Sequence, residues 1–171
     1  GLDDQPWQTV EIKPSRDDLE HPFDQIVIDN QRVGDRLTIY CAGHGIAPTI
    51  ASRCLLLPRA VASNPPILPN FDGSAWLEWF SRQTHFDEFV LWMDVCGTAA
   101  IEYARGEPSY GKNIQQRADL ASAKVFMAYP SGMGRDAYEG TNDSSIVRGF
   151  FTEQLLSGLN GAAADGNGEV R

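Results

Sequence analysis

The sequence predicts an α/β fold, a three-layer α/β/α sandwich with a mostly parallel central sheet. Four short apolar runs have the length of buried strands, and segments with helical periodicity alternate with them. The runs cover residues 37–41, 54–57, 89–95 and 125–129. Because apolar residues fill these runs throughout instead of alternating with polar ones, we expect strands that are covered on both faces of the sheet.

Three segments have the pattern of amphipathic helices. The first follows the caps at Ser15 and Asp17, with Pro22 expected in its first turn. The second follows Asp72 and ends before the strand at 89–95. The third covers residues 147–159, where apolar residues recur near i, i+3, i+4 and i+8.

The length of the chain fits a single domain. Its 171 residues are 42% hydrophobic, which is enough to bury one core. We assign residues 1–160 to this domain and residues 161–171, rich in Gly and Ala, to a flexible C-terminal tail.

The composition also excludes several classes of partner. The formal net charge of -9 argues against a nucleic-acid partner, because that binding depends on clustered Lys and Arg. There is no apolar run of membrane-spanning length and no signal-peptide pattern, so we expect a cytoplasmic protein without a membrane partner. Three cysteines without CxxC spacing fit neither a disulfide framework nor a zinc site. We expect reduced thiols, no metal and no cofactor.

Two candidate catalytic residues follow two of the predicted strands. His44, flanked by glycines, comes directly after residues 37–41, and Cys96 comes directly after residues 89–95. Because the carboxyl ends of parallel strands open at the same edge of a sheet, the two side chains can face each other. A thiol with a pKa of about 8.5 is mostly protonated at neutral pH, and an adjacent imidazole can activate it. The arrangement predicts a Cys/His pair for nucleophilic catalysis.

Each of these residues alone has a simpler interpretation. An isolated histidine is more often a surface or core residue than a catalyst, and a free cysteine is commonly an inert hydrophobe. We expect that inert role for Cys41 and Cys54, which lie inside apolar runs. If the pair is catalytic, the backbone N–H groups of Gly45 and Cys96 are the natural donors of an oxyanion hole.

Three segments together resemble one known family. Residues 40–45, Tyr-Cys-Ala-Gly-His-Gly, resemble the Tyr-x-Ala/Ser-Gly-His-Gly segment of caspase-like peptidases, and residues 91–96, Leu-Trp-Met-Asp-Val-Cys, resemble their strand ending in Asp-x-Cys. Residues 128–140, ending in Ala-Tyr-Glu-Gly, followed by residues 150–152 and 155–159, resemble the small-subunit portion of bacterial caspase-family proteins. The segments occur in family order, so the chain resembles the caspase and metacaspase family, which has the caspase-haemoglobinase fold.

The resemblance implies a thiol protease, a cysteine-type endopeptidase that acts on protein or peptide substrates with His44 and Cys96 as its catalytic pair. Asp94 stands where the animal caspases have Gln in Gln-Ala-Cys, and the corresponding metacaspase residue helps form the P1 pocket. A carboxylate there would pair with Arg or Lys at P1. We expect Ser131, in the loop Pro-Ser-Gly-Met-Gly, beside the same pocket. The alternative for Asp94 is a strand-end carboxylate that caps nearby backbone amides.

The chain also departs from the family pattern. The metacaspase His-Ser-Gly after the nucleophile is replaced by Gly97-Thr98-Ala99, and the usual first strand of the family has no match near the N-terminus. A missing N-terminal segment or a partner chain would then supply that strand. The second hypothesis is therefore a caspase-like pseudoenzyme, an interaction or regulatory domain whose site is idle.

Overall fold

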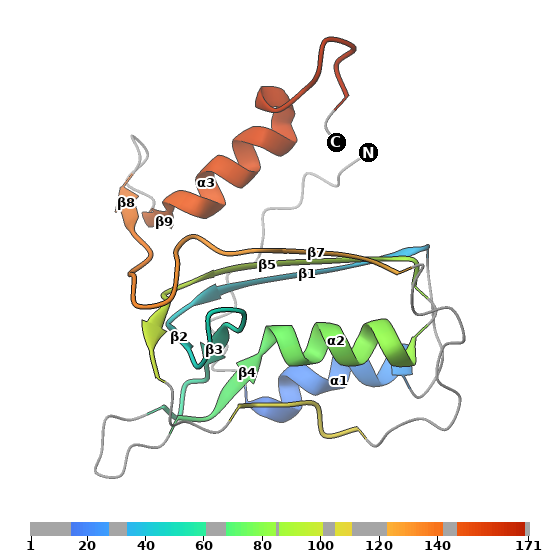
Figure 1. Ribbon diagram of the computed structural model, residues 1–171, viewed down its shortest axis with the longest axis vertical. Helices are drawn as coiled ribbons and strands as arrows, with labels where there is room; N and C mark the ends of the chain where they lie inside the picture. Colours follow the sequence, from blue (N-terminus) through green and yellow to red (C-terminus); the bar gives the residue numbers. More distant parts are fainter. Residues whose placement is uncertain are drawn as a thin grey trace.

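The fold is a mixed α/β arrangement around a parallel sheet of three strands. The computed structural model describes residues 15–27, 34–60, 68–84, 86–100, 105–110, 123–141 and 147–169. The strands are β1 (Arg36–Gly43), β5 (Glu88–Val95) and β7 (Lys124–Ala128), in the order β1-β5-β7. The helices of the described residues are α1 (Arg16–Val27), α2 (Gly73–Gln83) and α3 (Phe150–Ser157). In Figure 1, α1 and α2 lie on one side of this sheet and α3 on the other.

A second sheet, of four short strands, lies beside the first. It has the order β4-β3-β2-β6, built from β2 (Gly45–Ala47), β3 (Cys54–Leu56), β4 (Asn70–Asp72) and β6 (Thr98–Ala99). The strand predicted at residues 54–57 is β3, which pairs antiparallel with β2 and β4. The prediction that it joins the parallel sheet was wrong. The six residues between β2 and β3 are too few for a parallel crossover, so the two strands pair antiparallel.

A hairpin leads into the third helix. Strand β8 (Glu139–Thr141) pairs antiparallel with β9 (Val147–Gly149), and α3 begins directly after Gly149. The prediction of a helix over residues 147–159 was therefore wrong for residues 147–149, which form β9. A π-helical turn, Gly158–Ala162, continues α3, so the domain boundary predicted at residue 160 falls inside a helical turn.

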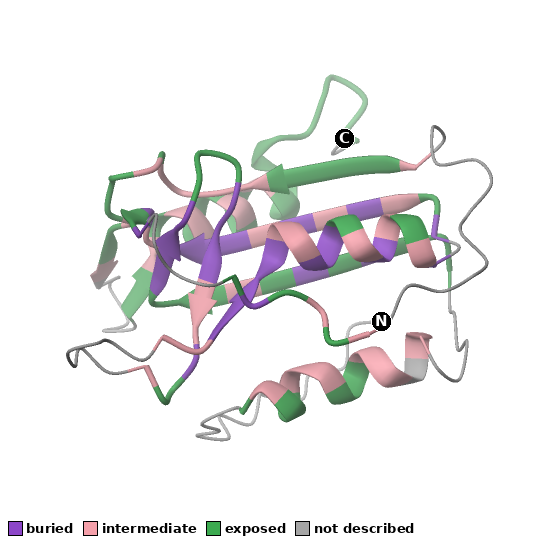
Figure 2. Ribbon diagram, turned by 60° about the horizontal axis from the view of Figure 1, so that its bottom comes forward, coloured by how far each residue is buried: buried purple, intermediate pink, exposed green. Residues whose placement is uncertain are grey.

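The main core lies between the parallel sheet and the pair α1 and α2. Every second residue of β5 from Phe89 to Met93 is buried against these helices, as are Leu37 and Ile39 of β1. In Figure 2 the buried positions lie along the strands and on the side of α2 that faces them. Phe23 of α1 packs its ring 5.1 Å from Trp76 of α2. This aromatic contact joins the two helices into one layer.

The opposite face of the parallel sheet is only partly covered, so the expectation of strands buried on both faces was wrong. Burial alternates along β1, and β7 is exposed along most of its length. No residue of α3 is buried. A cavity of about 540 Å³ separates α3 from the sheet, lined by Trp92, Phe126 and Leu155 among others. The predicted strands are mostly apolar in the sequence, but only one face of the sheet packs tightly against helices. The other face meets α3, which has no buried residue.

The start of α1 is set by a capping box. The Ser15 hydroxyl accepts from the Asp18 N–H at 3.3 Å, and the Ser15 backbone N–H donates to the Asp18 carboxylate at 2.8 Å. The Ser15 hydroxyl also donates to the Asp18 carboxylate at 2.7 Å, and this bond, followed by that of the Ser15 backbone N–H, lowers the pKa of Asp18. Because the box places the first turn before Leu19, Pro22 lies inside the helix, and the expectation that it occupies the first turn was wrong.

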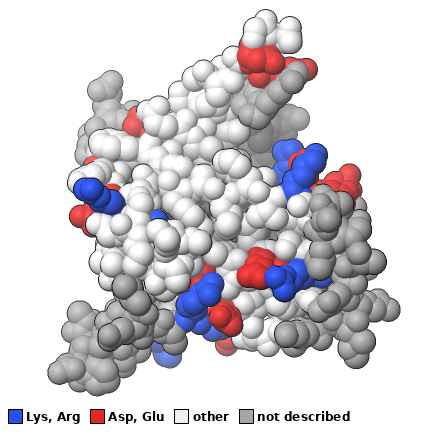
Figure 3. All heavy atoms as spheres, viewed as in Figure 1, with Lys and Arg blue, Asp and Glu red and all other residues white. Residues whose placement is uncertain are grey.

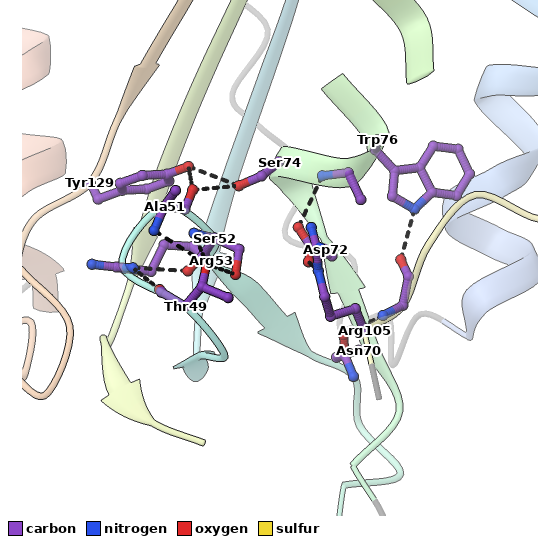
Figure 4. Close-up of polar contacts among 12 residues, drawn as sticks. Thr49, Ala51, Ser52, Arg53, Asn70, Asp72, Ser74, Trp76, Arg105 and Tyr129 are labelled. Atoms are coloured by element: carbon purple, nitrogen blue, oxygen red, sulfur yellow. Dashed lines mark hydrogen bonds and ion pairs between the residues drawn. The ribbon is translucent and has the colours of Figure 1, made fainter. Parts of the chain in front are cut away.

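The predicted cap of α2 is confirmed. Asp72 is fully buried, and its carboxylate accepts the Ala75 N–H at 3.0 Å. The other carboxylate oxygen pairs with Arg105 at 2.5 Å, as Figure 4 shows. The cap and the ion pair together compensate for the removal of this charge from water.

Charged side chains on the described surface lie in small mixed groups on the face shown in Figure 3. One such group joins the starts of the three parallel strands, where Glu88 of β5 pairs with Arg36 of β1 and Lys124 of β7. Hydrogen bonds from these two cations lower the pKa of Glu88. In the part of the chain that the structure describes, no helix has both the length and the apolar character needed to cross a bilayer.

Candidate functional site

The candidate site lies where β1 and β5 end. These strands are parallel neighbours, and their register pairs Gly43 with Val95, so the residues that follow each strand, His44 and Cys96, come together. They line one cavity of about 250 Å³. The complete lining is Ala42, Gly43, His44, Asp94, Cys96, Ala137, Tyr138, Glu139 and Gly149. Three of the predicted site residues, His44, Asp94 and Cys96, therefore share one cavity.

The two positions beside His44 favour glycine for different structural reasons. Gly43 has a φ of 148°, in the region that glycine favours. Gly45 packs so closely on Val95 that a Cβ at this position would overlap the Val95 side chain. The close packing brings the backbone next to His44 against the end of β5, directly before Cys96.

The backbone N–H of Gly45 points away from β3. The Leu56 N–H donates to the His44 carbonyl at 2.8 Å, which makes His44 and Leu56 a hydrogen-bonded pair. In an antiparallel ladder such pairs alternate with pairs that share no hydrogen bond, and the next pair is Gly45 with Leu55. The predicted oxyanion donor at Gly45 is therefore not used by β3.

Cys96 is partly exposed at the cavity and is held by the loop that follows β7. Its Sγ lies 3.9 Å from the Ala137 carbonyl oxygen, a weak contact in which the thiol donates. The neighbouring Gly97 donates its N–H to the Arg135 carbonyl at 2.9 Å and accepts from the Gly134 N–H at 2.6 Å. A Cβ at residue 97 would overlap this loop, so glycine is required directly after the cysteine.

Ser131 lies in the same loop but outside the cavity lining. Its hydroxyl donates to the Arg135 carbonyl at 3.0 Å, and its own carbonyl accepts from Arg53 at 2.9 Å. Figure 4 shows that Arg53 also reaches back to the segment at Thr49 and Ser52. This geometry gives no support to the predicted role of Ser131 in substrate binding and instead makes the residue part of the support for the loop.

Arg53, which donates to the Ser131 carbonyl, is itself buried. Only 2% of the residue is exposed, and its guanidinium lies 4.9 Å from the centre of the Tyr129 ring. Burial raises the pKa of Tyr129. No sequence motif marks this cluster, because its members come from the loop before β3 and from the residues that follow β7.

Asp94 lies at the end of β5 and is only 8% exposed. Its Oδ2 accepts the backbone N–H of Thr152 at 3.2 Å and also the Thr152 hydroxyl. These contacts are those of the alternative considered above, a strand-end carboxylate that caps backbone amides. They are also compatible with substrate contact, because the same residue lines the cavity and a carboxylate can accept more than two hydrogen bonds.

The other two cysteines differ from Cys96 in their surroundings. Burial raises the pKa of the Cys41 thiol to about 11, and burial followed by the Asp72 charge raises the pKa of the Cys54 thiol. All three cysteines are free. Among the described residues, no group of three or more His, Cys, Asp or Glu side chains is arranged to hold a metal ion.

Several residues of the cavity had no predicted role. Tyr138 directly precedes β8, Glu139 begins it, and Gly149 ends β9, where the ladder pairs it with Glu139. The sequence contained a signal for Tyr138 and Glu139, since residues 128–140 are part of the family resemblance. Their positions at the cavity depend on the β8–β9 hairpin. This hairpin was not predicted from the sequence, because residues 147–149 were assigned to a helix.

No protein-family model matches the chain, and neither a curated protein nor a solved structure matches it.

Proposed function

We propose that this protein is a cysteine endopeptidase of the caspase-like kind that cleaves after Arg or Lys. The observation that carries the proposal is the shared cavity of His44, Asp94 and Cys96 at the ends of two neighbouring parallel strands. The resemblance of residues 40–45 and 91–96 to caspase-like segments supports the same assignment. The three-layer caspase-like form of the α/β fold is part of this proposal.

The proposed reaction has two steps. In the first, His44 accepts the proton of Cys96, Sγ attacks the carbonyl carbon, and His44 passes the proton to the amine as the C–N bond breaks. In the second, water hydrolyses the thioester to a carboxylic acid and restores the free thiol. The N–H groups of Gly45 and Cys96 stabilise the oxyanion in both steps. Asp94 selects a cationic P1 side chain by charge.

The test is cleavage of a fluorogenic peptide panel with Arg, Lys, Asp or Leu at P1. We expect cleavage after Arg and Lys by the wild type and none by Cys96→Ala or His44→Ala, because each substitution removes one member of the pair. Cys41→Ala is the matched control and should retain activity, since Cys41 lies outside the cavity lining. Circular dichroism of each variant verifies that the fold is intact. Full activity of Cys96→Ala would disprove the proposal, and cleavage after Asp alone would disprove the role of Asp94.

A caspase-like domain with an idle site is the second candidate. Two contacts favour it: the Cys96 thiol donates to the Ala137 carbonyl, and Asp94 is already engaged by Thr152. In this case the peptide panel would show no cysteine-dependent cleavage of any member, while the fold of the variants would be unchanged.

A further inference from the structure

The carboxylate of Asp94 is fixed by residues on two other elements. Thr152, in the first turn of α3, gives both its N–H and its hydroxyl proton to Oδ2 of Asp94. Within the described residues no hydrogen bond engages Oδ1. One oxygen is thus held by two donors, while the other keeps its capacity to accept.

Tyr40 of β1 extends this contact into a chain. Its hydroxyl oxygen lies 2.7 Å from Oγ1 of Thr152. Because the Thr152 hydroxyl proton is directed to an ionised carboxylate, which only accepts, Tyr40 is the donor to Thr152. The chain therefore runs from Tyr40 through Thr152 to Asp94 and joins β1, α3 and β5.

The close approach of the α3 segment to Asp94 depends on a glycine. A Cβ at Gly149 would overlap the Asp94 carboxylate, so no other residue fits here without displacement of the segment. The N–H of Thr152 is one of the helix-start donors that lack a partner within the helix, and the positive end of the helix dipole favours a carboxylate beside it. Steric fit and charge together hold Asp94 at this end of α3.

We propose that Thr152 is a positioning residue for recognition of a cationic side chain, with Tyr40 acting through it. The inference rests on the proposed function, because it assigns the Asp94 side of the cavity to an Arg or Lys at P1. By holding Oδ2, Thr152 keeps the carboxylate plane in one orientation and leaves Oδ1 to accept from the substrate cation. Without the hydroxyl of Thr152 the carboxylate has one fixed donor instead of two and must be reoriented when the cation binds, which costs affinity.

The test measures binding of benzamidine, a small amidinium, against benzamide, its neutral near-isostere, by calorimetry on the full chain. We expect the wild type to prefer benzamidine, and Asp94→Asn to lose the preference. Thr152→Val should weaken benzamidine binding about tenfold, because the carboxylate must then be reoriented on binding, and leave benzamide binding unchanged. Thr152→Ser keeps the hydroxyl and should restore the wild-type value.

Tyr40→Phe is the second variant, for the case that Thr152→Val is poorly folded. It removes only the distal hydroxyl and should weaken benzamidine binding in the same direction, by about threefold, because the carboxylate keeps both of its direct donors. Unchanged benzamidine affinity in Thr152→Val, an equal loss for benzamide, or no benzamidine preference in the wild type would each overturn the inference. Since binding needs no turnover, a chain that binds as expected but cleaves no peptide would refute the peptidase and leave this inference standing.

Discussion

The three cysteines of this chain have the same chemistry and three different environments. Cys96 is partly exposed beside His44 in the cavity, whereas Cys54 is fully buried in β3 and Cys41 packs against the main core. Since the thiolate is the reactive form, a thiol whose pKa is raised reacts slowly at neutral pH. Position in the fold therefore separates a candidate nucleophile from two structural residues.

This separation predicts the order of alkylation. In the native protein at pH 8, iodoacetamide should label Cys96 first and Cys41 and Cys54 much more slowly. Because the pKa of Cys41 is raised to about 11, its rate should keep increasing with pH up to that value, whereas an unperturbed thiol levels off above about pH 9. Mass spectrometry of digests taken over time measures each rate, and His44→Ala should slow only Cys96. Equal rates for the three thiols would contradict the assignment of Cys96.

At the scale of the element, the N-terminus of α2 is stabilised by both a side-chain cap and a buried ion pair. Asp72 caps it, pairs with Arg105 and has no exposed surface, while Trp76 and Phe80 fix the buried side. The Trp76 indole N–H is also satisfied, by the Gly106 carbonyl at 3.0 Å. The position of α2 against β5 therefore depends on one buried carboxylate as well as on apolar packing.

Substitution of that carboxylate should be costly. We expect Asp72→Ala to lower the free energy of unfolding by about 2 to 4 kcal/mol, since it removes the cap and leaves Arg105 without its partner. Glu78→Ala is the control on the same helix, because it breaks only the exposed pair with Arg82, worth about 0.5 kcal/mol. Urea unfolding followed by circular dichroism measures both. A loss for Asp72→Ala no larger than that for Glu78→Ala would show that the cap is not needed.

At the scale of the whole molecule, the two faces of the parallel sheet differ in how they are covered. The face toward α1 and α2 forms the main core, and the other face meets α3 across a cavity, with no α3 residue buried. Near its start, α3 is joined to the sheet by the Tyr40, Thr152 and Asp94 chain. The candidate site thus lies where the well-packed and the loosely packed parts of the molecule meet.

Native-state hydrogen exchange should report this difference. We expect amides of β5 to exchange only by global unfolding, and amides of α3 to exchange through a local opening of lower free energy. Leu91→Ala, which removes a fully buried side chain of β5, should lower the opening free energy of β5 by about 2 to 5 kcal/mol and leave that of α3 unchanged. Protection of α3 equal to that of β5 would mean that the two faces unfold together.

The sequence by itself determined the parts that depend on local chemistry. The strands near residues 37–41, 89–95 and 125–129 and the cap of α2 follow from apolar runs and from Asp72, and both are confirmed. Parallel pairing of the strands at 37–41 and 89–95 was sufficient to predict that His44 and Cys96 lie together, because residues after neighbouring parallel strands share one edge of a sheet.

Tertiary structure alone decided the pairing of β3, the cover of the second sheet face and the neighbours of Asp94. An apolar run has the same composition whether its partners are parallel or antiparallel, so residues 54–57 carried no information on their sheet. The contacts of Asp94 with Thr152 and Gly149 join segments more than fifty residues apart, and no local pattern encodes such a distance. These contacts arise only when the hairpin β8–β9 brings the start of α3 to the end of β5.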